Sequence, residues 1–345
     1  MKENAIKTLK NLLFFIILVL ITFYVLFRKQ DPKELLNIII SAKTNYVLIG
    51  ILLMLLYFLA EAYNVKIILK TLNDRNIPII KALKYTFIGF FFSSITPAAS
   101  GGQPVEIYYM TKEKIKGENA TLAMLIILSG FQICTILLGI ICAILNPQIL
   151  TSRIIPLFVI GVIINGFVLS IMMICIFSKK LTKKLINIII KLINFFKFKN
   201  KEKIAEKLLN AIEKYNESSA FIISHKKEYI KSILIVLIQV IIYYSVPFCI
   251  VKAFDINTYN YFQIFTMQSI LHTAVSSMPL PGTIGVSELV FLDIFNPVFG
   301  TKKLNGAMLL NRGITFYLYV ILSLLVVTYN YIKINRKKES VSNDN

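Results

Sequence analysis

Long apolar segments constrain this chain more than any other feature of its sequence. They fall near residues 12–27, 46–65, 82–95, 119–145, 154–177, 232–251, 262–277, 284–299 and 304–332. Several of them approach the roughly 20 residues that an α-helix needs to cross a bilayer. With 56% hydrophobic residues, the 345-residue chain also has too few polar residues to coat a soluble fold. The sequence therefore predicts an all-α integral membrane protein, folded as a multi-span helical bundle.

The composition narrows the function classes further. The formal charge of +20 is explained by basic residues that flank membrane spans, so we do not expect direct nucleic-acid binding. We expect no cofactor and no metal site, because the sequence has no HExxH motif and no Walker loop. The Lys, Ile and Asn excess is typical of an AT-rich bacterium, which predicts a bacterial cell membrane location. The four cysteines lie in apolar spans without a CxxC pair and are interpreted as buried thiols: Cys134, Cys142, Cys175 and Cys249.

The basic residues also predict the topology. The polar insertion 178–231 carries 14 Lys and Arg residues, so we place it and both termini in the cytoplasm, with 252–260 outside. This arrangement requires 82–107 to enter and return on the cytoplasmic side, and 262–299 to enter and return on the outer side. The cytoplasmic side then holds 29 Lys and Arg residues and the outer side 8, with Arg312 left alone inside the membrane.

The same topology divides the chain into two halves, 12–145 and 154–332. Each reads as two spans, a re-entrant element and a further span, in opposite orientations. The re-entrant elements contain similar broken stretches, "SSITPAASGGQPVE" and "SSMPLPGTIGVSE". A broken backbone is tolerated in a membrane where it is buried in protein or lines a watery cavity. In inverted repeats, such breaks mark a transporter binding site. We therefore predict a central site at the two breaks, with a purely structural kink as the alternative.

Arg312 is the strongest candidate for chemistry at this site. A charge inside the membrane needs a partner, and Glu288 and Glu106 follow the two breaks. The planar guanidinium suits a lipid phosphate, since it donates two parallel hydrogen bonds. The alternative is an Arg–Glu pair that only holds helices together. The other candidate substrate-binding residues come from the breaks and the last span: Pro97, Gly101, Gly102, Gln103, Pro281, Gly282, Gly285 and Tyr317.

Four other polar residues lie in or near spans. His272 precedes the second break, and we expect it to form an interhelical hydrogen bond rather than relay protons. Glu61 and Lys66, near the end of the second span, are expected at the membrane interface. Asp293 lies in "VFLDIFNPVF", where the sequence indicates no partner.

Three motifs carry a family resemblance. The stretches "ITPAASGGQPVEIYYMTK", "MPLPGTIGVSELVF" and "LLNRGITFY" resemble the lysylphosphatidylglycerol synthase transmembrane family, over residues 12–332. The resemblance implies a membrane region that flips aminoacylated phospholipid. In two-part members, a soluble domain transfers lysine from lysyl-tRNA to phosphatidylglycerol. This sequence stops at Asn345, so we expect no transferase activity from it alone. Glu106 departs from the family pattern, in which many members have a basic or amide residue nearby.

Together these observations predict a multi-pass protein that flips phospholipid, such as aminoacylated phosphatidylglycerol, between leaflets. Arg312 would hold the phosphate, while Glu288 and Glu106 would balance charge or contact an amino headgroup. Two alternatives stay open. One is phosphatidylglycerol lysyltransferase activity, conferring cationic-peptide resistance, with a partner chain that supplies the transferase domain. The other is secondary transport of a small solute. The expected partners are the membrane, an anionic or aminoacylated phospholipid and either a soluble transferase or further copies of this chain.

Overall fold

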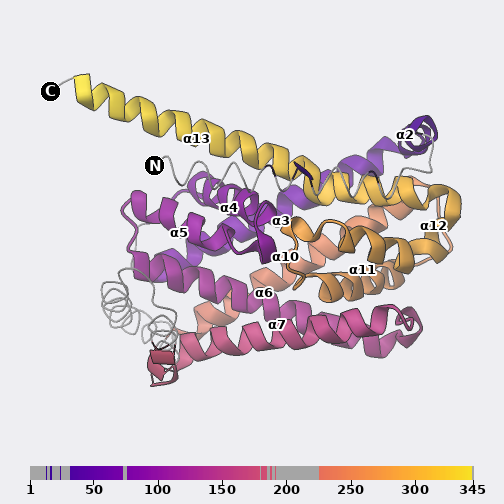
Figure 1. The fold of residues 1–345 in the computed structure, drawn as a ribbon, viewed down its shortest axis with the longest axis horizontal. Helices are drawn as coiled ribbons and strands as arrows, with labels where there is room; N and C mark the ends of the chain where they lie inside the picture. Colours follow the sequence, from indigo (N-terminus) through magenta and orange to yellow (C-terminus); the bar gives the residue numbers. More distant parts are fainter. Residues whose placement is uncertain are drawn as a thin grey trace.

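The computed structural model describes residues 32–72, 76–178 and 225–343, together with short stretches and single positions within 13–24 and 180–191. Most of the predicted first span (12–27) and most of the insertion (178–231) lie outside the described residues. The described part of the chain is helical and contains no β-strand, which confirms the all-α prediction (Figure 1).

Five helical segments in the described part are long and apolar enough to cross a membrane. They are α3 (Thr44–Thr71), α6 (Gly117–Leu145), α7 (Ile154–Phe177), α10 (Lys226–Ala253) and the continuous helical run Pro281–Ile332. Helix α10 packs along α3 and also contacts α6. Their exposed residues include large apolar side chains, such as Ile163 and Phe167 on α7. An apolar exposed surface of this kind requires lipid around it, so the fold is an integral membrane bundle.

The segment predicted to enter and return at 82–107 forms a helical hairpin. It consists of α4 (Ile79–Ser94), a short turn η1 (Pro97–Ala99) and α5 (Gly102–Lys112). Two glycines let its helices touch. A Cβ at Gly102 would lie 1.9 Å from Ser93 Oγ, and a Cβ at Gly89 would lie 2.6 Å from Glu106 Oε2.

A salt bridge ties the two ends of this hairpin together. Glu113, just after α5, pairs with Lys81 at 2.5 Å and also with Lys84, both near the start of α4. Tyr85 donates a third hydrogen bond to the same carboxylate at 2.8 Å. The hairpin therefore starts and ends on the same side of the bundle.

The second broken segment forms another hairpin. It consists of α11 (Tyr261–Val275), the turn η3 (Pro281–Thr283) and the first part of α12 (Val286–Arg312). Gly300 has φ 61 and ψ 168, which interrupts α12, so residues 286–299 return to the end where α11 began. Tyr259 Oη donates to the carbonyl of Pro297 at 3.1 Å and joins the two ends. The α4–α5 and α11–α12 hairpins lie at opposite ends of the bundle (Figure 1).

The chain after Gly300 completes the bundle. It runs through the remainder of α12, a π-helical turn η4 (Gly313–Tyr317) and α13 (Leu318–Asn343). Short elements cover the end where α11 begins: α2 (Pro32–Ile40) packs against α12, and η2 (Pro147–Ile149) links α6 to α7. Lys43 and Asp255 form a 2.5 Å ion pair at this same end.

Candidate functional site

The two breaks touch one another and have the same backbone conformation. Turns η1 and η3 are in direct contact, although they are far apart in sequence. Each break has an extended residue, a proline and then two residues with left-handed φ. The matched residues are Thr96 (φ −118, ψ 144) with Leu280 (φ −110, ψ 141), Pro97 with Pro281, Ala98 (φ 51) with Gly282 (φ 57), and Ala99 (φ 54) with Thr283 (φ 54). The helices of both hairpins are therefore interrupted by the same backbone conformation, at the point where the two hairpins touch.

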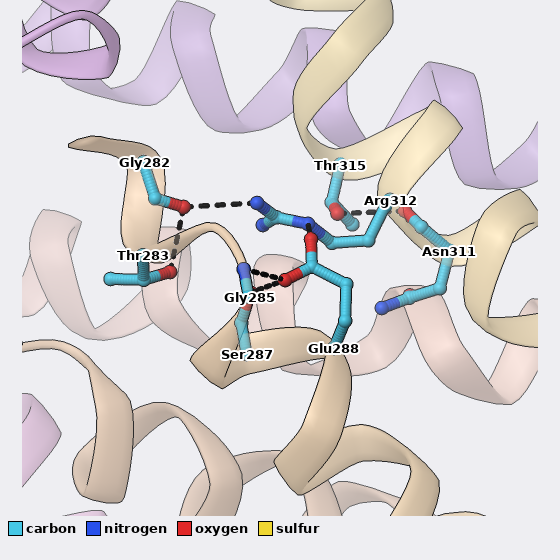
Figure 2. A network of polar contacts seen from close by, with 8 residues as sticks. All are labelled: Gly282, Thr283, Gly285, Ser287, Glu288, Asn311, Arg312 and Thr315. Carbon is cyan, nitrogen blue, oxygen red and sulfur yellow. Dashed lines mark hydrogen bonds and ion pairs between the residues drawn. The ribbon is translucent and has the colours of Figure 1, made fainter. Parts of the chain in front are cut away.

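Arg312 lies beside the second break and is buried. Its Nε donates to Glu288 Oε1 at 2.7 Å and its Nη2 donates to the carbonyl oxygen of Gly282 at 2.9 Å (Figure 2). Arg312 is 8% exposed and Glu288 is 2% exposed. The guanidinium also lies over the Phe316 ring, 4.3 Å from its centroid. The structure therefore brings together three of the residues that the sequence singled out.

Glu288 does not depend on Arg312 alone. Its Oε2 accepts from the backbone N–H of Gly285 at 2.7 Å and from Ser287 Oγ at 2.9 Å (Figure 2). The carboxylate caps the N-terminus of α12, where the helix dipole also favours negative charge. Glu288 would consequently keep two hydrogen-bond donors if Arg312 moved to another partner.

Gly282 is required by the geometry of this site. Its φ of +57 is in the left-handed region, and a Cβ would lie 2.2 Å from Cζ of Phe316. The glycine therefore allows the break to lie directly against the aromatic ring that stacks on Arg312.

The backbone after Arg312 departs from a regular α-helix. Residues Gly313–Tyr317 form a π-helical turn, a form that is frequent at functional sites. Thr315 Oγ1 donates to the carbonyl of Asn311 at 2.7 Å (Figure 2). Tyr317 lies close to Arg312, with its ring centroid 5.7 Å from the guanidinium carbon. Tyr317 is one of the predicted substrate-binding residues, whereas the π turn was not predicted.

The candidates in the first break have a different environment. Pro97 is exposed, Gln103 is half-buried, and the N–H of Gly101 donates to Thr96 Oγ1 at 2.8 Å. Gly102 packs against α4 rather than facing the break. Glu106 is 3% exposed, and among the described residues its Oε1 has no hydrogen-bond partner. Glu106 is therefore not the partner of Arg312 in this structure; Glu288 is.

Sequence reasoning missed a polar pair between α3 and α10. Gln239 Nε2 donates to Glu61 Oε2 at 3.2 Å, and Gln239 lies at the middle of α10. Glu61 thus faces a neighbouring helix rather than only the membrane interface where we expected it. The signal was present as one polar residue within each apolar run, "YFLAEAYNV" and "IVLIQVII".

Two other expectations are resolved by contacts. His272 Nδ1 and Tyr244 Oη lie 3.1 Å apart and link α11 to α10, which confirms the expected interhelical hydrogen bond. Asp293 faces Arg153, with Oδ1 and Nη1 4.0 Å apart on exposed side chains. This pair supplies the partner of Asp293 that the sequence did not indicate.

Comparison with known proteins is consistent with this architecture. The UPF0104 membrane protein PH1989 of Pyrococcus horikoshii is 24% identical over 318 residues, covering 86% of this chain and 91% of the relative. A UPF0104 membrane protein of Archaeoglobus fulgidus is 23% identical over 329 residues, covering 90% and 94%. Both relatives are archaeal, so the bacterial location stays a prediction. The model of the lysylphosphatidylglycerol synthase TM region matches residues 11–323, and the chain therefore belongs to this family of membrane proteins.

Proposed function

We propose that this protein translocates an anionic phospholipid between the leaflets of a membrane, with the headgroup passing the point where the two breaks meet. One observation carries the proposal: two broken hairpins from opposite ends of the bundle touch, and a buried Arg312 binds the second of the two breaks at the carbonyl of Gly282. Broken helices in two related halves are typical of the binding sites of alternating-access transporters. The two inverted halves, 12–145 and 154–332, are part of this proposal.

Arg312 is suited to a phosphate headgroup. A guanidinium carries five N–H donors, and the bonds to Glu288 and Gly282 use two of them. A phosphate could replace the carbonyl of Gly282, a neutral acceptor, with a stronger charge-assisted bond. Because Glu288 is also held by Gly285 and Ser287, Arg312 can share its charge with a phosphate without leaving a bare carboxylate.

The lipid, rather than a small solute, is favoured by two features. The tip of the first break is exposed and mostly apolar, over Pro97, Ala98 and Ala99, which suits contact with a lipid. The family is described by a lipid-modifying synthase, lysylphosphatidylglycerol synthase, whose product has a phosphate headgroup. Phosphatidylglycerol and its lysyl ester are the first substrates to test.

The proposal is tested with purified protein in liposomes that contain fluorescent phosphatidylglycerol. Transfer between leaflets is measured with a membrane-impermeant quencher. Arg312→Gln removes the charge and Arg312→Lys removes the planar fork, so we expect both to lose most of the transfer. Arg153→Gln is the matched control, because Arg153 is an exposed arginine at one end of the bundle.

Folding is measured in the same samples by thermal unfolding. If Arg312 serves only as the partner of Glu288, the double variant Arg312→Gln, Glu288→Gln should recover transfer and stability together. Full transfer by a folded Arg312→Gln protein would refute the phosphate-binding role. Solute uptake without lipid transfer in the wild type would refute the lipid substrate.

A further inference from the structure

Two carboxyl groups of the bundle have no basic partner in the described part of the chain. Glu61 is on α3 and Glu106 is on α5. Among the described residues, the ion pairs use other carboxylates, and none brings Lys or Arg to Glu61 or Glu106. An unpaired charge in this environment is costly, so at least one of the two must be neutralised by a bound cation or a proton.

The hydrogen bonds favour a proton on Glu106 rather than on Glu61. Glu61 is half-buried and accepts a hydrogen bond from Gln239, which suits an ionised carboxylate. Glu106 is 3% exposed, and its Oε1 has no partner in the described part of the chain. A buried carboxylate without a donor is much less stable than a neutral carboxyl group.

The other titratable groups on α5 and on the helices packed against it do not pair with Glu106 in the described part of the chain. They are Lys81, Lys84 and Tyr85 of α4, Tyr108, Tyr109 and Lys112 of α5, and Glu118, Cys134 and Cys142 of α6. The α4 groups bind Glu113. None of these groups supplies a basic partner to Glu106 in the described part of the chain.

We propose that Glu106 is a proton-binding site and that loss of its proton opens the first broken hairpin. The proton leaves the Glu106 carboxyl group for water. Glu106 Oε2 lies against Gly89 of α4, at a closed contact of the hairpin. An ionised Glu106 would have to be hydrated, which requires α4 and α5 to separate. The coupling to transport rests on the proposed lipid translocation, but the proton site does not.

The proton site is tested directly by infrared spectroscopy of the full-length protein in lipid, titrated with acid and base. A buried protonated carboxyl group gives a carbonyl band that the amide of glutamine does not. We expect this band in the wild type and in Glu34→Gln, a matched change at an exposed carboxylate of α2, and its loss in Glu106→Gln. The same band in all three proteins would overturn the assignment.

The coupling is tested in liposomes with a pH difference across the membrane. If one proton moves with each lipid, a difference of one pH unit changes the equilibrium ratio of lipid between the two leaflets by up to about tenfold. We expect lipid transfer in the wild type to follow the pH difference, and transfer in Glu106→Gln to be independent of it. A rate of lipid transfer that depends on sodium but not on pH would contradict proton coupling and would indicate coupling to a metal cation instead. If the wild type moves no lipid, the proposed function fails, whereas the infrared result still decides the proton site.

Discussion

The two breaks share a backbone but differ in the chemistry around their carboxylates. At the second break, Glu288 has three hydrogen-bond donors, from Arg312, Gly285 and Ser287. In the first hairpin, Glu106 Oε1 has none among the described residues. Glu288 follows Pro281 by seven residues and Glu106 follows Pro97 by nine, so the two carboxylates are not at matched positions. The same backbone conformation therefore interrupts the helices of both hairpins. The side chains differ, so the two breaks differ in the groups that they can bind.

The difference between the two carboxylates is tested most strongly by changing each of them to glutamine. Glu288→Gln leaves Arg312 as an unpaired buried charge, and breaking a buried pair in this way costs roughly 3–5 kcal/mol. Glu106→Gln replaces a carboxyl group without donors by an amide of the same shape, so we expect its unfolding free energy to change little or to rise. Both are measured by SDS-induced unfolding in mixed micelles. Equal destabilisation by the two changes would show that Glu106 has a charged partner after all.

The second largest effect is expected at the left-handed residue of the second break. Gly282→Ala places a Cβ 2.2 Å from Phe316 Cζ and forces alanine into a positive φ. Overpacking and the left-handed backbone together cost about 2–4 kcal/mol. We expect a lower unfolding midpoint and weaker lipid transfer, since Phe316 also supports the Arg312 guanidinium. The double change Gly282→Ala, Phe316→Ala removes the clash but keeps the left-handed strain and leaves a cavity, so we expect it to stay less stable than the wild type. A stable, active Gly282→Ala protein would contradict the close contact.

Much of this fold could be predicted from the sequence, because apolar length and helix-breaking residues are local signals. Both hairpins were predicted, with their breaks at the observed residues. The pairing of Arg312 with Glu288 rather than Glu106 could not be chosen, because it depends on which break lies beside the last span. The Glu61–Gln239 bond was missed for the same reason: it joins residues 178 positions apart, and one polar residue in an apolar run does not indicate what it faces.

The two hairpins also differ in the ion pairs at their ends, and we expect these ion pairs to affect stability less than the residues at the breaks do. Burial raises the pKa of the Glu113 carboxyl, but its hydrogen bonds from Lys81, Lys84 and Tyr85 outweigh burial and lower the pKa from 4.5 to about 2. This ion-pair contribution is present above about pH 4.5 and is lost as the pH falls toward 2. We expect Glu113→Gln to lose about 1 kcal/mol of stability near neutral pH, after allowance for solvent screening.

The measurement is the unfolding midpoint of the wild type and Glu113→Gln as a function of pH. The difference between the two should shrink as the pH falls below about 4.5. Asp293→Asn is the matched change in the second hairpin, and we expect little effect because its pair with Arg153 is long and exposed. If Asp293→Asn lowered the unfolding midpoint more than Glu113→Gln did, the ion pair of the second hairpin would be the stronger one, contrary to our expectation.

The smallest effect is expected at the residue of the first break that matches Gly282. Ala98 has φ 51 and is exposed, so it bears the left-handed strain that glycine avoids in the second break. Ala98→Gly should remove a steric cost of about 1–2 kcal/mol, but it also makes the unfolded chain more flexible by about half of that. We therefore expect a small net rise in the unfolding midpoint and little change in lipid transfer, because only one exposed methyl group of the first break is removed. A loss of transfer would show that the strain itself helps the first hairpin to open, which would give the first break an active role in transport beyond holding the helices apart.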